Sequence, residues 1–210
     1  MARLYFFVDG LNLWHALDYS ESASDHGCYH KYKWINLAKL ATCYVVNKKD
    51  TIVGVEYFTA LITWDAAKLA RHKIFIKAQE NEGVRITYGG FKRKDVRCKL
   101  CNKTFSTAEE KQTDVNIALR LYQLAVQDAY DKAIIISGDT DLLAGVKFVR
   151  GDFPSKQIGV VIPIGRRSED FKNQADFHYK MKEIHLQTSR FDDTITLKDK
   201  STLSCPANWK

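Results

Sequence analysis

Proline, cysteine and long apolar runs are all scarce in this sequence of 210 residues. Only 3 prolines and 11 glycines occur, which excludes a collagen-like chain and one built mainly of flexible linkers. No apolar run approaches the roughly 18 residues that a membrane span needs, so no membrane association is expected. The apolar start of the chain stops at Asp9 without a small-residue cleavage site, which is too short for a secretory signal. We therefore expect a cytoplasmic protein.

The cysteines are five, an odd number that argues against a disulfide framework in a reducing compartment. Only Cys98-Lys-Leu-Cys101 has metal-ligand spacing, and it supplies half of a closed zinc site, which needs four nitrogen or sulfur ligands. His26, Cys28 and His30 are candidates for the missing ligands, and a second subunit of a homodimer is another source. The sequence leaves a structural Zn²⁺ and two reduced thiols on a tight turn as alternatives.

The composition is otherwise that of a globular protein with an excess of positive charge. Apolar residues make up 45% and charged residues 27%, which argues against a disordered chain. The formal net charge is +7, and six basic residues against one acid place +5 of it within residues 91–103. A basic stretch of this kind favours a polyanionic partner such as RNA.

Strand and helix patterns alternate through most of the chain. Apolar or β-branched runs predict strands at 4–8, 52–62, 84–88, 133–136 and 158–162. Apolar stripes of helical period predict helices at 11–17, 34–46, 63–79, 114–129, 142–149 and 168–174. This alternation predicts an α/β fold of three layers, in which helices cover both faces of a mainly parallel sheet of about five strands.

One domain is expected over residues 1–185. Residues 91–111 interrupt it with charges, the cysteine pair and no clear period, and they are interpreted as a basic insertion in the form of a charged loop. The remaining residues, 186–210, are polar and are expected to form a tail packed on the domain surface.

Acidic residues follow two of the expected strands. Asp9 ends the first strand, and Asp139 and Asp141 follow the strand at 133–136. Asp114 begins the helix that leads into that second strand. Ligands of open α/β sheets gather beyond the carboxyl ends of the strands, where four clustered carboxylates would repel each other unless a cation neutralised them. Hard oxygen ligands suit Mg²⁺ or Mn²⁺, and such a site supports metal-assisted hydrolysis of a phosphodiester.

Helix capping is the alternative explanation for these acids. An aspartate at a strand-to-helix junction commonly accepts a backbone N–H, and Asp114, Asp139 and Asp141 each fit that description. Capping needs only one acid, so acids at two strand ends favour the ligand interpretation. A phosphatase of the HAD type is set aside, because it needs Asp-x-Asp after its first strand and this chain has Asp9-Gly-Leu.

Three segments resemble the motifs of NYN-domain proteins, the PIN-like ribonuclease group. They are Val8-Asp-Gly-Leu-Asn12, Glu110-Lys-Gln-Thr-Asp114-Val-Asn-Ile-Ala118 and Ser137-Gly-Asp-Thr-Asp141. Asn173-Gln-Ala-Asp176 is similar to a late family element, and Pro206-Ala-Asn-Trp209 resembles the tail of bacterial LabA-like (DUF88) members. The resemblance covers most of the chain and implies a PIN-like fold with divalent-metal-dependent endoribonuclease activity. A non-catalytic RNA-binding regulator of the same fold is the alternative.

The resemblance also implies roles for individual residues. The catalytic and metal-binding acids would be Asp9, Asp114, Asp139 and Asp141. Asn12 would contact the substrate phosphate or orient an acid, while Ser137 and Thr140 would hydrogen-bond the acids or the phosphate. Asp176 is a weaker candidate for orienting them.

Basic residues near the second motif are candidates for holding RNA. Lys111 is placed to neutralise a scissile phosphate, and a purely solvated lysine is the alternative. The insertion would hold the phosphate backbone through Lys92, Arg93 and Lys94. Phe91 and Phe105 flank this stretch and could stack on unpaired bases, although the sequence favours packing beneath the loop.

Overall fold

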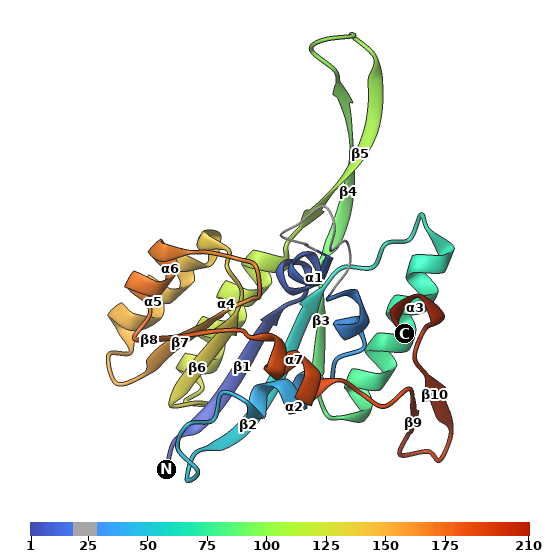
Figure 1. Ribbon diagram of the computed structural model, residues 1–210. Helices are drawn as coiled ribbons and strands as arrows, with labels where there is room; N and C mark the ends of the chain where they lie inside the picture. The colour runs from blue at the N-terminus through green and yellow to red at the C-terminus, as the bar shows by residue number, and fades with distance from the viewer. Residues whose placement is uncertain (19–28) are drawn as a thin grey trace.

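A parallel sheet of six strands forms the centre of the computed structural model, which describes residues 1–18 and 29–210 (Figure 1). Every neighbouring pair in this sheet is parallel. Its strands, in spatial order, are β3 (Arg85–Tyr88), β2 (Thr51–Thr59), β1 (Arg3–Asp9), β6 (Lys132–Ile136), β7 (Gln157–Ile162) and β8 (Phe177–Lys180). The predicted α/β fold with a mainly parallel sheet is confirmed, with one more strand than expected.

Helices cover both faces of the sheet. They are α1 (Gly10–Asp18), α2 (Leu37–Thr42), α3 (Ala66–Asn81), α4 (Thr113–Val126), α5 (Leu143–Asp152), α6 (Glu169–Gln174) and α7 (Glu183–Ser189), with short 3-10 turns at His30–Lys33, Thr140–Leu142 and Ala207–Trp209. None of these helices is long and apolar enough to cross a membrane.

Two hydrophobic cores result, because successive side chains of a strand point to opposite faces. Phe6 and Val8 of β1 pack into the core formed with α1, α2, α3 and α7, whereas Phe7 packs into the core formed with α4, α5 and α6. The central strands are buried on both faces, which is why they read as continuous apolar runs in the sequence.

Residues 90–111 form an antiparallel hairpin, and the expectation of a charged loop is therefore wrong here. β4 (Gly90–Arg97) pairs with β5 (Thr104–Lys111), and the hairpin extends away from the sheet (Figure 1). Most of its side chains are exposed or half-buried, so neither face carries the alternation of apolar and polar residues by which strands are found.

The sixth strand, β8, was also absent from the sequence prediction. It is a four-residue edge strand beside β7. A Cβ at Gly159 of β7 would lie 2.0 Å from the Phe177 ring, so this glycine makes room for the aromatic side chain of the neighbouring strand. A strand of four residues shows only one or two repeats of the alternation between apolar and polar side chains. The sequence pattern of β8 therefore could not be distinguished from that of a loop.

Residues 186–210 reach the core beside α1 and α3. They form a small hairpin of β9 (Thr194–Thr196) and β10 (Thr202–Ser204) and bury Phe191, Cys205 and Trp209. The Trp209 side chain is 2% exposed, and its ring lies 5.2 Å from that of Trp14. Polar residues separate these three buried side chains in the sequence, so no apolar pattern marks them.

Replacement of this buried tryptophan tests the contribution of the segment to stability. Trp209→Ala is expected to lower the free energy of unfolding by about 3–5 kcal/mol, because it opens a cavity in the core. Urea unfolding followed by circular dichroism measures the change. Lys210→Ala is the control, since Lys210 is exposed and should change stability by less than about 0.5 kcal/mol. An equal effect of both substitutions would contradict the prediction.

Candidate functional site

Asp9 is a buried carboxylate that joins the ends of β1 and β6. Its Oδ1 accepts a hydrogen bond from the Asn12 backbone N–H at 3.0 Å, and its Oδ2 accepts one from Ser137 Oγ at 2.7 Å. The Asn12 side chain adds a second link between α1 and the loop after β6, because its Oδ1 accepts a hydrogen bond from the Gly138 N–H at 3.0 Å. These bonds fix the first turn of α1 against the loop after β6.

Gly10 of the first motif has a steric role. A Cβ at this position would lie 2.5 Å from the backbone oxygen of Phe58 and 2.6 Å from the ring of Tyr57. Only glycine therefore lets α1 begin directly against β2. The close start of the helix brings Asn12 within reach of both strand ends.

The loop after β6 carries two acids with different surroundings. Asp139 Oδ1 accepts the backbone N–H of Asp141 at 3.0 Å, so Asp139 caps the 3-10 turn at Thr140–Leu142. Its own N–H donates to Ser137 Oγ at 3.0 Å. The carboxylate of Asp141 is exposed. The capping alternative is thus right for one oxygen of Asp139, while the second oxygen accepts no hydrogen bond from the residues that the structure describes.

Asp114 lies in the first turn of α4 rather than at its cap. The cap residue is Gln112, whose φ of 80° is in the left-handed region. Asp114 lines a pocket of about 300 Å³ together with Asp9 and Asp139, and this acidic pocket lies beyond the carboxyl ends of β1 and β6. The structure therefore brings three of the four predicted acids around one pocket.

Several other residues of the acidic pocket were not predicted from the sequence, and three of them are ionisable groups of note. Glu110 accepts a hydrogen bond from the Thr113 hydroxyl, His15 is exposed, and Arg166 follows β7. The Nε of Arg166 is buried and has no hydrogen-bond partner among the described residues. Applying the strand-end rule to β7 as well as to β1 and β6 would have pointed to this arginine.

Two acids of this pocket, Asp9 and Asp114, are harder to ionise than free carboxylates. Burial is the main cause that raises the pKa of Asp9 to about 6, and the charges of Asp114 and Glu110 raise it further. Burial also raises the pKa of Asp114, with added repulsion from Asp139 and Asp141. Among the described residues, however, no group of three or more His, Cys, Asp or Glu side chains could hold a metal ion.

A family model of the NYN domain matches residues 3–182. The chain belongs to the NYN domain family. This membership confirms the family resemblance and indicates a PIN-like nuclease family.

Two known proteins resemble this NYN domain more distantly. The 6-hydroxy-3-succinoylpyridine 3-monooxygenase HspA of Pseudomonas putida is 23% identical over 221 residues, covering 87% of this chain and 67% of the relative. A protein of unknown function from Vibrio parahaemolyticus, with a crystal structure, has a TM-score of 0.54 at 18% identity. That match covers 87% of this chain and 94% of the Vibrio chain, and it shows the fold alone.

The predicted lysines lie on the hairpin beside the acidic pocket of this NYN domain. Lys111 lines the pocket, but its Nζ lies 2.7 Å from Glu109 Oε1, so its charge is already paired. That hydrogen bond is the main cause of the lowered pKa of Glu109, to which the charges of Lys94 and Lys92 add. Thr140 is an exposed residue of the turn after Asp139.

The two phenylalanines that flank the basic stretch, Phe91 and Phe105, lie in different surroundings. The Phe91 ring packs edge-on against Trp64 with centroids 5.0 Å apart, and the Arg93 guanidinium lies 5.9 Å from the same indole. Phe105 is 53% exposed. The expectation that these aromatics pack beneath the basic segment therefore describes Phe91 only.

Cys98 and Cys101 lie at the tip of the hairpin. Backbone N–H groups of Cys101 and Leu100 hydrogen-bond the Cys98 sulfur and lower its pKa. His30 lies elsewhere, with its Nε2 3.8 Å from Asp18 Oδ1. His26 and Cys28 lie outside the described residues, so the described part of the chain offers the cysteine pair no further ligand.

Asp176 has a structural role at the end of the sheet where the strands begin. The suggestion that it orients the acids is therefore wrong. Its Oδ2 accepts the Ile158 N–H at 2.7 Å at the beginning of β7, and its Oδ1 pairs with Arg150 at 3.0 Å. The acids lie where the strands end, and the length of β7 separates them from Asp176.

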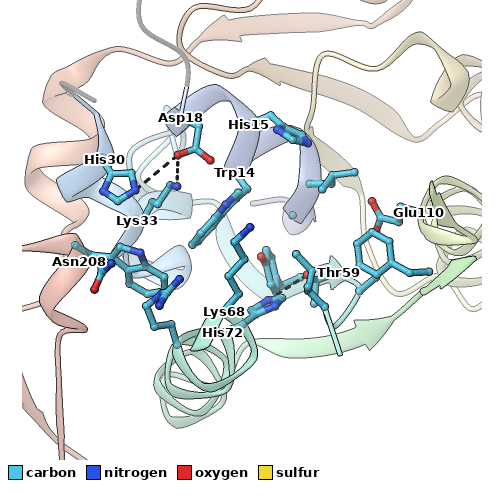
Figure 2. A pocket seen from close by; sticks show the side chains of 18 residues that line it. Trp14, His15, Asp18, His30, Lys33, Thr59, Lys68, His72, Glu110 and Asn208 are labelled. Carbon is cyan, nitrogen blue, oxygen red and sulfur yellow. Dashed lines mark hydrogen bonds and ion pairs between the residues drawn. The ribbon is translucent and has the colours of Figure 1, made fainter. Parts of the chain in front are cut away.

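A second pocket of about 420 Å³ adjoins the acidic one (Figure 2). Its walls come from α1, the end of β2, α3 and the turn at Ala207–Trp209. Aromatic and basic side chains predominate, among them Trp14, Lys68, Arg71, His72 and Trp209. No motif marks this aromatic pocket, because the residues that form it are scattered along the chain.

Ionisation of Asp9 is expected to make folding less stable as pH rises. Its pKa in the folded chain, about 6, exceeds the ordinary aspartate value of 3.8, so the folded state holds the proton more tightly. Stability is therefore full below about pH 4 and is lost as pH rises through about 6. Asp9→Asn, which stays neutral, should be more stable than the wild type at pH 7.5 by up to about 3 kcal/mol.

Urea unfolding in metal-free buffer at pH 4 and pH 7.5 measures this difference. It should disappear at pH 4, where Asp9 is protonated. Asp170→Asn is the control, because Asp170 is exposed and should leave stability unchanged at both values. A variant less stable than the wild type at pH 7.5 would contradict the expectation.

Proposed function

We propose that this NYN domain is a divalent-metal-dependent endoribonuclease that hydrolyses RNA phosphodiester bonds. The observation that carries the proposal is the acidic pocket at the ends of β1 and β6, with Asp9 buried and Asp114 and Asp139 beside it. Family membership supports the nuclease class. The mutual repulsion of the acids supports a cation as their partner, because a cation would favour their ionised forms.

Mg²⁺ or Mn²⁺ fits this pocket, because these ions can bind with few ligands from the protein itself. Such ions are commonly held through one or two carboxylates, with water and substrate phosphate completing the shell. Asp9 and Asp114 would hold the ion, while Asp139 and Asp141 add negative charge. When bound, the ion lowers the pKa of the attacking water and neutralises charge on the phosphate.

The remaining residues of the pocket orient these acids and the phosphate. Asn12 and Ser137 act as positioning residues. The Asn12 backbone N–H and the Ser137 hydroxyl each hydrogen-bond one oxygen of Asp9, and the Asn12 side chain accepts a hydrogen bond from the loop after β6. Arg166 has a buried Nε that finds no hydrogen-bond partner in the described part of the chain, and its charge is suited to a phosphate oxygen. Lys111 would have to leave Glu109 before it could take part.

RNA is the proposed partner of the hairpin. Lys92, Arg93 and Lys94 place three positive charges on the strand that leads from the body of the domain, and phosphates would bind to them. Trp64 is 43% exposed and offers an indole face near this strand for an unpaired base.

Zinc at the tip of the hairpin stays a prediction. Cys98 and Cys101 would supply two ligands, and the described residues do not complete the four that a closed site needs. A second copy of the chain would contribute the other two, which ties this prediction to a homodimer.

Removal of the acids tests the proposed reaction. Asp9→Asn and Asp114→Asn should each reduce Mn²⁺- or Mg²⁺-dependent cleavage of labelled RNA by at least about a hundredfold, because both side chains would hold the ion. Gel analysis of the products, with EDTA and matched DNA as parallel reactions, measures the loss. Asp170→Asn should cleave like the wild type. Salt-sensitive RNA binding without cleavage in any divalent metal would favour the non-catalytic alternative instead.

The hairpin lysines have a separate test in the salt dependence of RNA binding. Lys92→Ala combined with Lys94→Ala should weaken binding and reduce the slope of log K against log salt by about 1.4, since two phosphate contacts are lost. Titrations at several salt concentrations in EDTA measure the slope. Lys48→Ala with Lys49→Ala, exposed and before β2, is the charge-matched control. Equal slopes for the two double variants would rule out a phosphate-binding role for the hairpin.

A second candidate function comes from the Pseudomonas putida relative, which is named as a monooxygenase of a succinoylpyridine. The aromatic pocket has a volume and lining suited to a small heteroaromatic acid. We rank this candidate second, because the identity is 23% and the NYN family model supports a nuclease. It predicts a wild-type protein that cleaves no RNA.

A further inference from the structure

The aromatic pocket beside α1 combines features that none of the motifs explains. Its volume of about 420 Å³ is in the range of small-molecule sites. In Figure 2, Trp14, Lys68 and His72 surround its middle, while His30 and Asn208 lie at one end and Glu110 at the other. Together these side chains determine the chemical class of ligand that the pocket can bind.

Trp14 provides a fixed aromatic platform. The Lys33 ammonium lies 4.3 Å from its ring centroid and the Trp209 ring packs edge-on at 5.2 Å. The His72 ring lies 6.4 Å away, yet the indole stays partly exposed within the pocket. A planar ligand can stack on such a platform without the cost of ordering it first.

Among residues 1–18 and 29–210, the acids do not pair with every cation of the pocket. Lys33 is paired with Asp18, and Lys68 Nζ lies 3.8 Å from Asp65 Oδ2. Arg71 has no ion pair or hydrogen bond with any described residue. Lys68 and Arg71 are three residues apart on α3 and therefore share one face of the helix. This face favours an anionic group on the ligand.

Neutral polar groups complete the lining. Thr59 Oγ1 and His72 Nε2 lie 3.2 Å apart, and burial lowers the pKa of His72 to about 4, so the imidazole is uncharged near neutral pH. A neutral imidazole keeps one donor and one acceptor. Such groups suit the polar edge of a heterocycle, in addition to the face that stacks on Trp14.

The aromatic pocket continues into the acidic one. Leu11, His15 and Glu110 line both, and Glu110 marks the end of the aromatic pocket that faces the acids. A ligand that extends past Glu110 would carry its next group toward Asp9 and Asp114. A nucleotide within an RNA chain has this shape, with a planar base, an anionic phosphate and a continuing backbone.

We propose that the aromatic pocket is a subsite for one nucleotide of single-stranded RNA, whose base stacks on Trp14 and whose phosphate pairs with Arg71. The subsite rests on the proposed nuclease function, because it serves the nucleotide adjacent to the phosphate that the acidic pocket would cleave. Lys68 adds a second positive charge on the same face. The stacking surface tolerates any base, since every base has an aromatic face.

Calorimetric titration of the whole protein in EDTA tests the subsite without any cleavage. The probes are adenosine and uridine 5′-monophosphates, with ribose 5-phosphate to remove the base. Both mononucleotides should bind, and ribose 5-phosphate should bind at least about tenfold more weakly because stacking is lost. Arg71→Gln should weaken mononucleotide binding about tenfold. Lys73→Gln, on the same helix and outside the pocket, should leave it unchanged.

Fluorescence and competition locate the bound nucleotide. Mononucleotides should quench tryptophan emission in the wild type and less in Trp14→Phe, and they should compete with a short single-stranded RNA. Equal binding of ribose 5-phosphate, an unaffected Arg71→Gln variant, or mononucleotide binding without competition would each overturn the subsite. Nucleotide binding without cleavage would contradict the nuclease and leave the pocket supported, whereas cleavage without nucleotide binding would do the reverse.

Discussion

The carboxylate of Asp9 is the constraint on which the site depends. One of its oxygens holds the first turn of α1 and the other holds the loop after β6, so two elements more than a hundred residues apart share one buried anion. Burial makes this charge costly, and its hydrogen bonds reduce the cost without removing it. The orientation of α1 then determines where Asn12 lies on one side and Trp14 on the other. The helix that Asp9 holds in place therefore lines both pockets.

The acidic pocket lowers the stability of the folded chain. Burial, with repulsion from neighbouring acids, raises the pKa of Asp9 and of Asp114, a cost that packing elsewhere must offset. Most of that packing lies in the two cores, where β1 and β6 are buried on both faces. A parallel sheet suits this arrangement, because its strand ends open to solvent at one edge while its interior stays dry.

Much of the fold could be predicted from the sequence, because buried parallel strands leave continuous apolar runs such as 133–136. The acids could be found for a related reason, since Asp9 follows such a run directly and Asp139 follows one after two residues. The hairpin and β8 could not, because exposed or four-residue strands carry too little periodicity. Arg166 and the aromatic pocket depend on tertiary contacts, and no local pattern marks residues that meet only after folding.

The burial of Trp209 has a consequence for the order in which the cores close during synthesis. The core around Phe7 draws on residues up to about Phe171, so it can assemble before the segment at 205–209 has been made. The core around Phe6 includes Cys205 and Trp209 and must wait for them. Until then Trp34 and Phe75 face an unfinished surface, which is the kind of apolar exposure that chaperones bind. The aromatic pocket, walled by the same tryptophan, thus forms only after residues 205–209 have been made.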